Sequence, residues 1–492
     1  LLVFLFFYTV LANAQQIEAG GFHSIALKSN GMMYSWGNGV FGQLGNDKDT
    51  VFNTPQPVIQ TRVLKGKKVV QIAAGYEYTL ALADDGTLFA WGSNDHGELG
   101  NGYRIKSYAP VAVYTGGALK GKKIIDIATG YYHSIALADD GTLFAWGYNY
   151  YGQLGNGNYA DSNFPVPVNM DGALKGKKIT QISAGYGHTL ALADDGTLFA
   201  WGWNDFGQLG NGNTNDSNIP VPVNMDGVLK GKKITKIEPG VDHSIALADD
   251  GTLFSWGWNN YGQLGNGNNT ESNVPVTVNM DGALKGKKIV QIAAGWDHSL
   301  ALADDGTLFA WGKNYYGQLG NEGNADSNVP VAVNMDGALK GKKFVQISAG
   351  NYYSLALADD GTLFAWGKNY YGQLGNGGNA DSNVPVPVFM TFMGLLPTEN
   401  NPVTPSEFSL LQNYPNPFNP NTEISFELPY SADITLSVFN SLGELVQVVA
   451  SGTFEQGKHT VSFTANNLPS GVYFYRLHSN GFAQSLKMLL IK

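Results

Sequence analysis

Short apolar runs alternate with turns rich in glycine and aspartate along most of the chain. Within residues 177–223, apolar runs at 190–193 and 197–201 are separated by Asp194-Asp195-Gly196, which predicts a β-hairpin with glycine in the left-handed position of a three-residue loop. Residues 178–182 predict a further strand. Residues 220–223 are also extended in pattern, and because prolines donate no amide hydrogen bond, we expect this segment at a sheet edge or end.

The same unit recurs seven times. Its Trp-Gly dipeptide returns every 55 residues, at Trp36, Trp91, Trp146, Trp201, Trp256, Trp311 and Trp366. Strand-rich units in such an array are typical of a propeller or a solenoid, and ring closure leaves only short protected edges, so we predict an all-β fold with a seven-bladed β-propeller. Because the first unit starts close to Gln15, we expect residues 385–388 to pair with N-terminal material and close the ring.

Every unit carries a form of the pattern AGxxHS/T-LAL-xxDG-xLFAWG-xNxxGQLGNG. This pattern resembles the regulator of chromosome condensation repeat family, which implies a seven-bladed propeller over residues 15–390. The signatures of kelch and WD repeats are absent from the sequence. The founding member of the family is a nuclear exchange factor for a small GTPase, and we do not expect that partner here, given the two chain ends described next.

The N-terminal segment predicts export. Residues 1–11 are apolar and are followed by Ala12-Asn13-Ala14. Eleven apolar residues are too few to span a bilayer as a helix, but they fit the core of a secretory signal peptide with cleavage between Ala14 and Gln15. We therefore predict a signal peptide over residues 1–14. The alternative is a buried strand.

The C-terminal part predicts a second module. Residues 391–407 contain a stretch rich in Pro, Asn and Thr without apolar periodicity and predict a linker. Alternating segments in residues 408–492 predict a small β-sandwich. This region resembles the type A C-terminal sorting domain of the bacterial type IX secretion system, and the positions that carry the match include Asn413, Pro415, Pro417, Gly471, Tyr473, Lys487 and Lys492. The resemblance implies contact with the type IX machinery and a secreted or outer-surface protein of a Gram-negative, Bacteroidota-type bacterium. The alternative is an immunoglobulin-like stalk.

Composition removes several classes of function. The net charge is −10 and the pI is near 5.3, which argues against a nucleic-acid partner because such a partner requires a basic surface. The chain has no cysteine, so it contains neither disulfides nor thiolate nucleophiles.

The repeated polar residues predict structural roles. One column holds His23, His133, His188, His243 and His298, with Tyr78 and Tyr353 at the other two positions. Equivalent positions lie one blade apart, too far to share an ion, so we expect no metal site there. Paired aspartates at the hairpin tips and Asn/Asp-rich loops such as 211–218 are typical of turns rather than of catalysis or calcium binding. We predict no catalytic residue and no cofactor, and we expect no polar departure from the repeat.

The columns that vary between units are largely aromatic, and they flank strand ends. Rigid aromatic side chains are enriched at binding hot spots. We therefore predict a ligand-binding face formed by Tyr131, Tyr148, Tyr150, Tyr186, Trp203, Trp258, Trp296, Tyr315 and Tyr370. The alternative is that these rings pack between blades. A neighbouring column that includes Phe41, Tyr151 and Phe206 is aromatic in nearly every unit and is expected to be structural.

These observations favour a monomeric, non-enzymatic binding module that engages an extracellular protein through one propeller face. Glycan binding by the same rings is the second hypothesis, and a polysaccharide-cleaving enzyme with a site in the central channel is the third. A purely structural role at the cell surface also remains open.

Overall fold

The structure is a computed structural model that describes residues 14–390 and 408–491, except positions 412, 414–415, 466–467 and 480–481. The chain divides into two compact units between residues 391 and 392. Residues 1–13 of the predicted signal peptide, the predicted linker 391–407, Pro415 and Lys492 lie outside the described residues.

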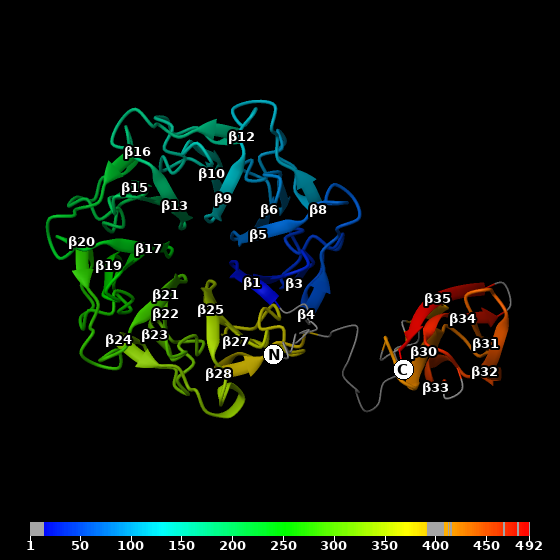
Figure 1. Ribbon diagram of the computed structural model, residues 1–492. Helices are drawn as coiled ribbons and strands as arrows, with labels where there is room; N and C mark the ends of the chain where they lie inside the picture. The colour runs from blue at the N-terminus through cyan, green and yellow to red at the C-terminus, as the bar shows by residue number, and fades with distance from the viewer. Residues whose placement is uncertain are drawn as a thin grey trace, which may run out of the picture. The chain divides into compact units, whose positions relative to one another are not determined.

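The first unit is a ring of seven four-stranded antiparallel sheets around a central channel (Figure 1). Each sheet is one blade and consists of four strands that are consecutive in the sequence. The strands nearest the channel are β1 (Ala14–Ala19), β5 (Val69–Ala74), β9 (Ile124–Thr129), β13 (Ile179–Ala184), β17 (Ile234–Pro239), β21 (Ile289–Ala294) and β25 (Phe344–Ala349). The fold class predicted from the repeat is confirmed.

The other three strands of each blade follow outward in chain order. The second strands are β2 (His23–Lys28), β6 (Tyr78–Ala83), β10 (His133–Ala138), β14 (His188–Ala193), β18 (His243–Ala248), β22 (His298–Ala303) and β26 (Tyr353–Ala358). The third strands are β3 (Met33–Gly37), β7 (Leu88–Gly92), β11 (Leu143–Gly147), β15 (Leu198–Gly202), β19 (Leu253–Gly257), β23 (Leu308–Gly312) and β27 (Leu363–Gly367). The outer strands are β4 (Phe52–Pro57), β8 (Ser107–Ala112), β12 (Ser162–Pro167), β16 (Ser217–Pro222), β20 (Ser272–Thr277), β24 (Ser327–Ala332) and β28 (Ser382–Pro387).

Local sequence explains the hairpins and the edges. Gly196 has a φ of 83°, and its N–H donates to the carbonyl of Ala193 at 3.0 Å, which closes the turn between β14 and β15 as predicted. The strand β16 pairs with β15 alone and so lies at the sheet edge, as expected because its prolines have no amide N–H to donate. A short 3₁₀ turn, η1 (Gly337–Leu339), precedes β25.

Among the described residues the ring closes without strand exchange, so the prediction that residues 385–388 pair with N-terminal material is wrong. The outer strand β28 pairs with β27 of its own blade, and β1 pairs with β2. The reason is the phase of the repeat: each unit begins with an inner strand, so the first blade already contains all four of its strands. Ile17, Trp36 and Tyr353 are instead buried in one apolar cluster that joins the first and last blades.

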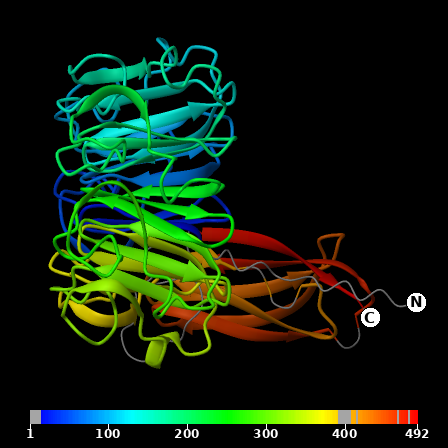
Figure 2. The ribbon, with the colours of Figure 1, turned by 90° about the vertical axis from the view of Figure 1, so that its left-hand side faces the viewer.

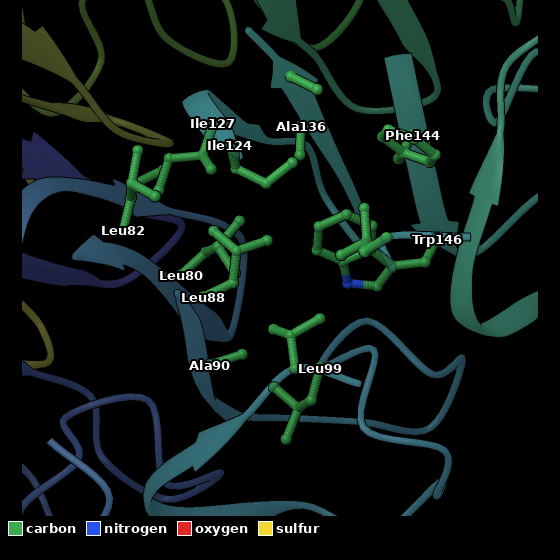
Figure 3. Close-up of a cluster of buried hydrophobic side chains, with 14 of the residues drawn as sticks. Leu80, Leu82, Leu88, Ala90, Leu99, Ile124, Ile127, Ala136, Phe144 and Trp146 are labelled. Carbon is green, nitrogen blue, oxygen red and sulfur yellow. The ribbon is translucent and has the colours of Figure 1, made fainter. Parts of the chain in front are cut away.

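The core lies between blades. In one such cluster, Leu80 and Leu88 of the second blade pack with Ile127, Phe144 and Trp146 of the third (Figure 3). The seven repeated tryptophans are fully buried, and each indole N–H donates to a carbonyl of the preceding blade; that of Trp146, for example, donates to Glu98 at 2.9 Å. The repeated tryptophans therefore serve the blade-to-blade contact.

The second unit is a β-sandwich of two sheets. One sheet has the order β29 (Ser409–Leu410), β30 (Asn421–Leu428), β33 (Gly457–Thr464), and the other has the order β32 (Leu445–Phe454), β31 (Ala432–Phe439), β34 (Gly471–Ser479), β35 (Phe482–Leu490). Phe426 and Phe463 from the first sheet share a buried core with Leu436, Tyr475 and Met488 from the second. No helix in the described part of the chain is both long enough and apolar enough to cross a membrane.

Candidate ligand-binding face

The antiparallel blades place their loops on two opposite faces of the ring (Figure 2). The loop from the first to the second strand and the loop from the third to the fourth strand leave the same end of a blade. The Asp-Asp-Gly hairpin and the LKGKK connector to the next blade leave the other end. The first end carries the predicted aromatic columns, and we call it the aromatic face.

The opposite face is decorated with one repeated ion pair. In the fourth blade, Lys177 Nζ lies 2.6 Å from Asp195 Oδ2 and also donates to Thr197 at 3.1 Å. The hydrogen bond from Lys177 holds the pKa of Asp195 at about 2. Equivalent pairs are Lys67–Asp85, Lys122–Asp140, Lys232–Asp250, Lys287–Asp305 and Lys342–Asp360. These aspartates are ordinary exposed turn residues, which fits the structural role predicted for them.

On the aromatic face, the residue after Trp-Gly lies against the loop between the first and second strands of the same blade. The N–H of Trp203 donates to the carbonyl of Gly187, and that of Tyr148 donates to Tyr132, each at 2.8 Å. The residue after Trp-Gly is thus fixed against the loop between the first and second strands. Trp203 packs on Tyr151 of the preceding blade with ring centroids 5.1 Å apart, and Trp258 packs on Phe206 at 4.3 Å.

Three predicted residues lie at the mouth of the central channel. Tyr131, Tyr186 and Trp296 line it together with Tyr76. The rings of Tyr76 and Tyr131 stack at 3.6 Å, and Tyr131 contacts Tyr186 at 4.3 Å. Burial raises the pKa of Tyr131 and of Tyr186. These phenols are neutral at physiological pH and form a rigid aromatic rim.

Three further predicted residues stand out into solvent. Tyr150, Tyr315 and Tyr370 are 68%, 71% and 69% exposed. Each contacts its chain neighbour edge-on, as Tyr150 contacts Tyr151 at 5.1 Å. Their rings cover little apolar surface of the protein, so burial does not account for them.

Ring contacts join all nine predicted residues into one network. Tyr148 and Tyr150 reach Trp203 through Tyr151, and Trp203 reaches the channel rim through Tyr186 at 5.7 Å. Trp296 contacts Tyr131 of the rim at 6.5 Å. The remaining links run through Phe206 to Trp258, through Tyr352 and Tyr316 from Trp296 to Tyr315, and through Phe22 and Tyr371 to Tyr370. The nearly invariant aromatic column that the sequence assigns to structure therefore lies on the same face and connects the variable rings.

One column of this face was missed by the sequence analysis. It is the second position after the glycine that follows each inner strand, and it holds Phe22, Glu77, Tyr132, Gly187, Asp242, Asp297 and Tyr352. Desolvation raises the pKa of Glu77 and of Asp242 to about 7. The signal that could have found this column is its variation among otherwise similar units.

The channel below the rim is polar, and it does depart from the repeat. Its cavity measures about 310 Å³, and its lining includes Glu18, Asp126 and Glu238 at inner-strand positions. Burial raises the pKa of Glu18 to about 7 and, with repulsion from Glu18, that of Glu238 to about 8. The expectation that no polar residue breaks the repeat is wrong, because inner-strand positions that look like ordinary strand alternation line a common channel once the ring closes.

The repeated histidines tie blades together. His188 Nε2 is hydrogen-bonded to Ser244 Oγ of the next blade at 3.0 Å, and the other four histidines make the same contact with a serine or threonine. In blades that carry tyrosine instead, Tyr78 donates to the carbonyl of His133 at 2.5 Å. These contacts give the column a structural role.

The polar side chains of the Asn/Asp-rich loops form hydrogen bonds within their own loops. Asn204 Nδ2 donates to the carbonyls of Asn213 and Asn215, each at 3.0 Å, and its N–H donates to Asp216. Within the described residues, no group of three or more His, Asp or Glu side chains is arranged to hold a metal ion.

The described residues of the sorting motif lie on the sandwich. Asn413 is buried, its Nδ2 donates to Thr422 Oγ1 at 2.9 Å, and Tyr475 donates to a carbonyl beside it, that of Leu411, at 2.8 Å. Tyr473 donates to Pro469 at 2.9 Å. Gly471 and Lys487 lie in the paired strands β34 and β35, and Pro417 precedes the bridge at Phe418.

The comparisons with known proteins decide the family. The RCC1-like domain family matches residues 8–282 and 164–400. The chain belongs to this family. The secretion system C-terminal sorting domain family matches residues 412–492, so the second unit is a type IX sorting domain, as the tail sequence predicts.

Individual relatives of this RCC1-like chain differ in how much of their own length the match covers. The ultraviolet-B receptor UVR8 of Arabidopsis thaliana is 37% identical over 370 residues, which cover 75% of this chain and 80% of the receptor. The E3 ubiquitin-protein ligase HERC2 of Mus musculus is 35% identical over 347 residues, but these are 70% of this chain and 7% of the ligase. The crystal structure of human WBSCR16 is similar with a TM-score of 0.64 and 27% identity, covering 73% of this chain and 94% of that one. Yeast RCC1 (Prp20), solved with Kap60, has a TM-score of 0.63 at 24% identity over 78% of this chain and 87% of that one.

Proposed function

We propose that this RCC1-like protein is a secreted or cell-surface binding module whose aromatic face engages an extracellular protein. In this proposal the sorting domain at residues 408–492 engages the type IX machinery of a Bacteroidota-type bacterium, and a signal peptide over residues 1–14 precedes a propeller of residues 15–390 and a linker of residues 391–407. The propeller acts as a monomer and performs no catalysis.

The observation that carries the proposal is the exposure of Tyr150, Tyr315 and Tyr370 on one connected aromatic face. Tyrosine buries a large area at a small entropic cost and keeps a polar hydroxyl, so it suits a protein interface. The two faces also differ in how regular they are. The opposite face carries Lys–Asp pairs that repeat in six copies, whereas the residues of the aromatic face vary from blade to blade.

Glycan binding is the second candidate, and one hollow favours it. Phe22, Tyr316, Tyr370, Asn379 and Asp381 line a hollow of about 610 Å³ on the aromatic face. Rings beside amide and carboxylate groups supply the stacking surface and hydrogen-bond partners that a sugar uses. We rank this candidate second because the hollow covers only one part of the face.

The test is capture by the purified full-length chain. The immobilised protein is exposed to surface extracts of host cells, saturable partners are identified by mass spectrometry, and a glycan array is run in parallel. We expect a protein partner whose capture is lost when Tyr150, Tyr315 and Tyr370 are all replaced by serine. The matched control is a charge change on the opposite face, Lys340→Met, which leaves capture intact. A glycan signal without a protein partner favours the second candidate, and capture that survives the triple replacement contradicts the proposed face.

A further inference from the structure

Three successive blades carry different charges at one pair of facing positions. The first position is the second residue after the glycine that follows the inner strand (Gly240, Gly295 or Gly350), and the second is the residue after Trp-Gly. In each blade a backbone hydrogen bond joins the two: the N–H of Trp258 donates to Asp242 at 2.8 Å, that of Lys313 to Asp297 at 2.9 Å, and that of Lys368 to Tyr352 at 2.8 Å. The backbone frame is therefore the same, and only the side chains differ.

The sixth blade contains a complete pair. Lys313 Nζ lies 3.1 Å from Asp297 Oδ2, and the two side chains are 19% and 5% exposed. The ammonium also lies over the rings of Tyr261 and Tyr352, at 4.1 Å and 5.1 Å from the centroids. A carboxylate and aromatic faces together stabilise a desolvated cation. In this blade the two facing positions therefore form an ion pair within the chain.

The fifth blade has the carboxylate but not the cation. Asp242 Oδ1 is buried without a hydrogen-bond partner, and no basic side chain among the described residues forms an ion pair with Asp242. Trp258 stands where the sixth blade has its lysine, and it packs on Phe206 as Lys313 packs on Tyr261. Desolvation and the nearby charge of Asp297 raise the pKa of Asp242 to about 7. An unpartnered carboxylate in such a site costs free energy that a cation recovers.

The seventh blade has the cation but not the carboxylate. Lys368 Nζ lies over the rings of Tyr316, Tyr352 and Phe22, at 4.8, 5.3 and 5.4 Å. Tyr352 occupies the position of the acid, and within the described residues Lys368 forms no ion pair. Asp381 lines the hollow on the aromatic face together with Lys368, but it acts on the lysine only at longer range. Desolvation lowers the pKa of Lys368.

We propose that the aromatic face docks a protein that places a lysine or arginine against Asp242 and a carboxylate against Lys368. The inference rests on the proposed function and adds the charge pattern of the partner. Among these three blades, the sixth pairs its two charges within the chain, so the fifth leaves an acid and the seventh leaves a cation for the ligand. A protein surface carries both signs of charge, whereas a neutral glycan carries neither.

Two labelled peptides serve as probes with the full-length chain. Both are flexible Gly-Ser decapeptides, one with three lysines and the other with three glutamates, and binding is measured by fluorescence anisotropy at about 0.15 M salt, where distant charges are screened. We expect Asp242→Asn to reduce the affinity for the lysine peptide by about tenfold or more, because a charge-assisted contact is lost. Lys368→Met should weaken the glutamate peptide similarly.

Matched variants remove the same charges from the opposite face. Asp249→Asn and Lys340→Met lie in exposed loops there and should change binding by less than about twofold. Trp258→Lys should abolish binding of the lysine peptide, because the new side chain can pair with Asp242 as Lys313 pairs with Asp297. Thermal unfolding of each variant verifies that it is folded.

The results separate this inference from the proposed function. Equal effects of the face variants and their controls, or no binding of either peptide to the unmodified chain, overturn the charge pattern. If the triple tyrosine variant loses the captured partner while Asp242→Asn and Lys368→Met retain it, the inference fails and the proposed function stands. If the tyrosine variant retains that partner, the proposed face itself fails.

Discussion

The side chain of Gln346 forms two hydrogen bonds with the backbone of Ile17, a residue that precedes it by 329 positions. The N–H of Ile17 donates to Gln346 Oε1 at 3.0 Å, and Gln346 Nε2 donates to the carbonyl of Ile17 at 2.9 Å. Beside them, the N–H of Ala19 donates to Ser348 Oγ at 3.0 Å. These bonds and the apolar cluster around Ile17, Trp36 and Tyr353 join the first and last blades, which share no paired strands in the described part of the chain.

Replacing Gln346 should therefore weaken ring closure. Gln346→Leu leaves the N–H and the carbonyl of Ile17 without their partners, and we expect the free energy of unfolding to fall by about 1–3 kcal/mol. Denaturant unfolding measures this loss, and hydrogen exchange should be faster at the Ile17 amide. Gln291→Leu is the control, because it removes one bond, to the N–H of Ile347, at an internal seam. If exchange at Ile17 is equally fast in both variants, Gln346 has no special role in closure.

The buried histidines should make the propeller sensitive to acid. Burial lowers the pKa of His243 from 6.5 to about 3, and the other four histidines of the column behave alike. Between pH 6.5 and 3 the unfolded chain binds protons that the folded chain does not, so stability falls as the pH drops below 6.5. At pH 5 each buried histidine lowers the free energy of unfolding by on the order of 1–2 kcal/mol.

His243→Tyr should reduce this loss, since tyrosine already occupies the column at Tyr78 and Tyr353. The measurement is the difference in unfolding free energy between pH 7 and pH 5, which should shrink by roughly 1–2 kcal/mol in the variant. Ser299→Ala removes the hydrogen-bond partner of His243 but not its titration. It should lower stability by a similar amount at both pH values. An unchanged pH dependence in His243→Tyr would contradict the assignment.

The sequence predicts the blades well because each blade is a local object repeated seven times. The hairpin at Gly196 and the edge strand β16 both follow from contacts within one unit. Ring closure and the channel depend on residues far apart in sequence. Glu18 and Glu238 occupy one column that holds alanine or serine in the other units, but only the closed ring places them on a shared channel. Likewise, the unpartnered state of Asp242 emerges only beside the neighbouring Lys313–Asp297 pair.

The channel carboxylates should make the protein less stable at alkaline pH. Burial raises the pKa of Glu238 from 4.5 to about 8, so between these values the folded chain binds a proton that the unfolded chain has released. The contribution of protonated Glu238 to stability is therefore fully present below pH 4.5, and it is lost as the pH rises toward 8. Glu238→Gln should stabilise the protein at pH 9 by at least about 1 kcal/mol and change little at pH 4.

Thermal unfolding across this pH range provides the measurement for Glu238→Gln. Glu271→Gln, which removes an exposed charge from the same blade, is the matched control and should show no such pH dependence. A Glu238→Gln variant that is equally stabilised at pH 4 and pH 9 would show that the effect is not ionisation of the channel carboxylate.

The final prediction separates binding from packing on the aromatic face. Tyr150, Tyr315 and Tyr370 are largely exposed, so replacing each by serine should change the free energy of unfolding by no more than about 0.5 kcal/mol. Trp203 is half-buried and contacts both Tyr151 and Tyr186. Trp203→Ala should therefore cost roughly 1–3 kcal/mol, somewhat less than truncation of a fully buried ring. Denaturant unfolding of the four single variants measures these differences. Tyrosine variants as destabilised as Trp203→Ala would mean that the exposed rings serve the blades, and their position on the face would then be no argument for a ligand.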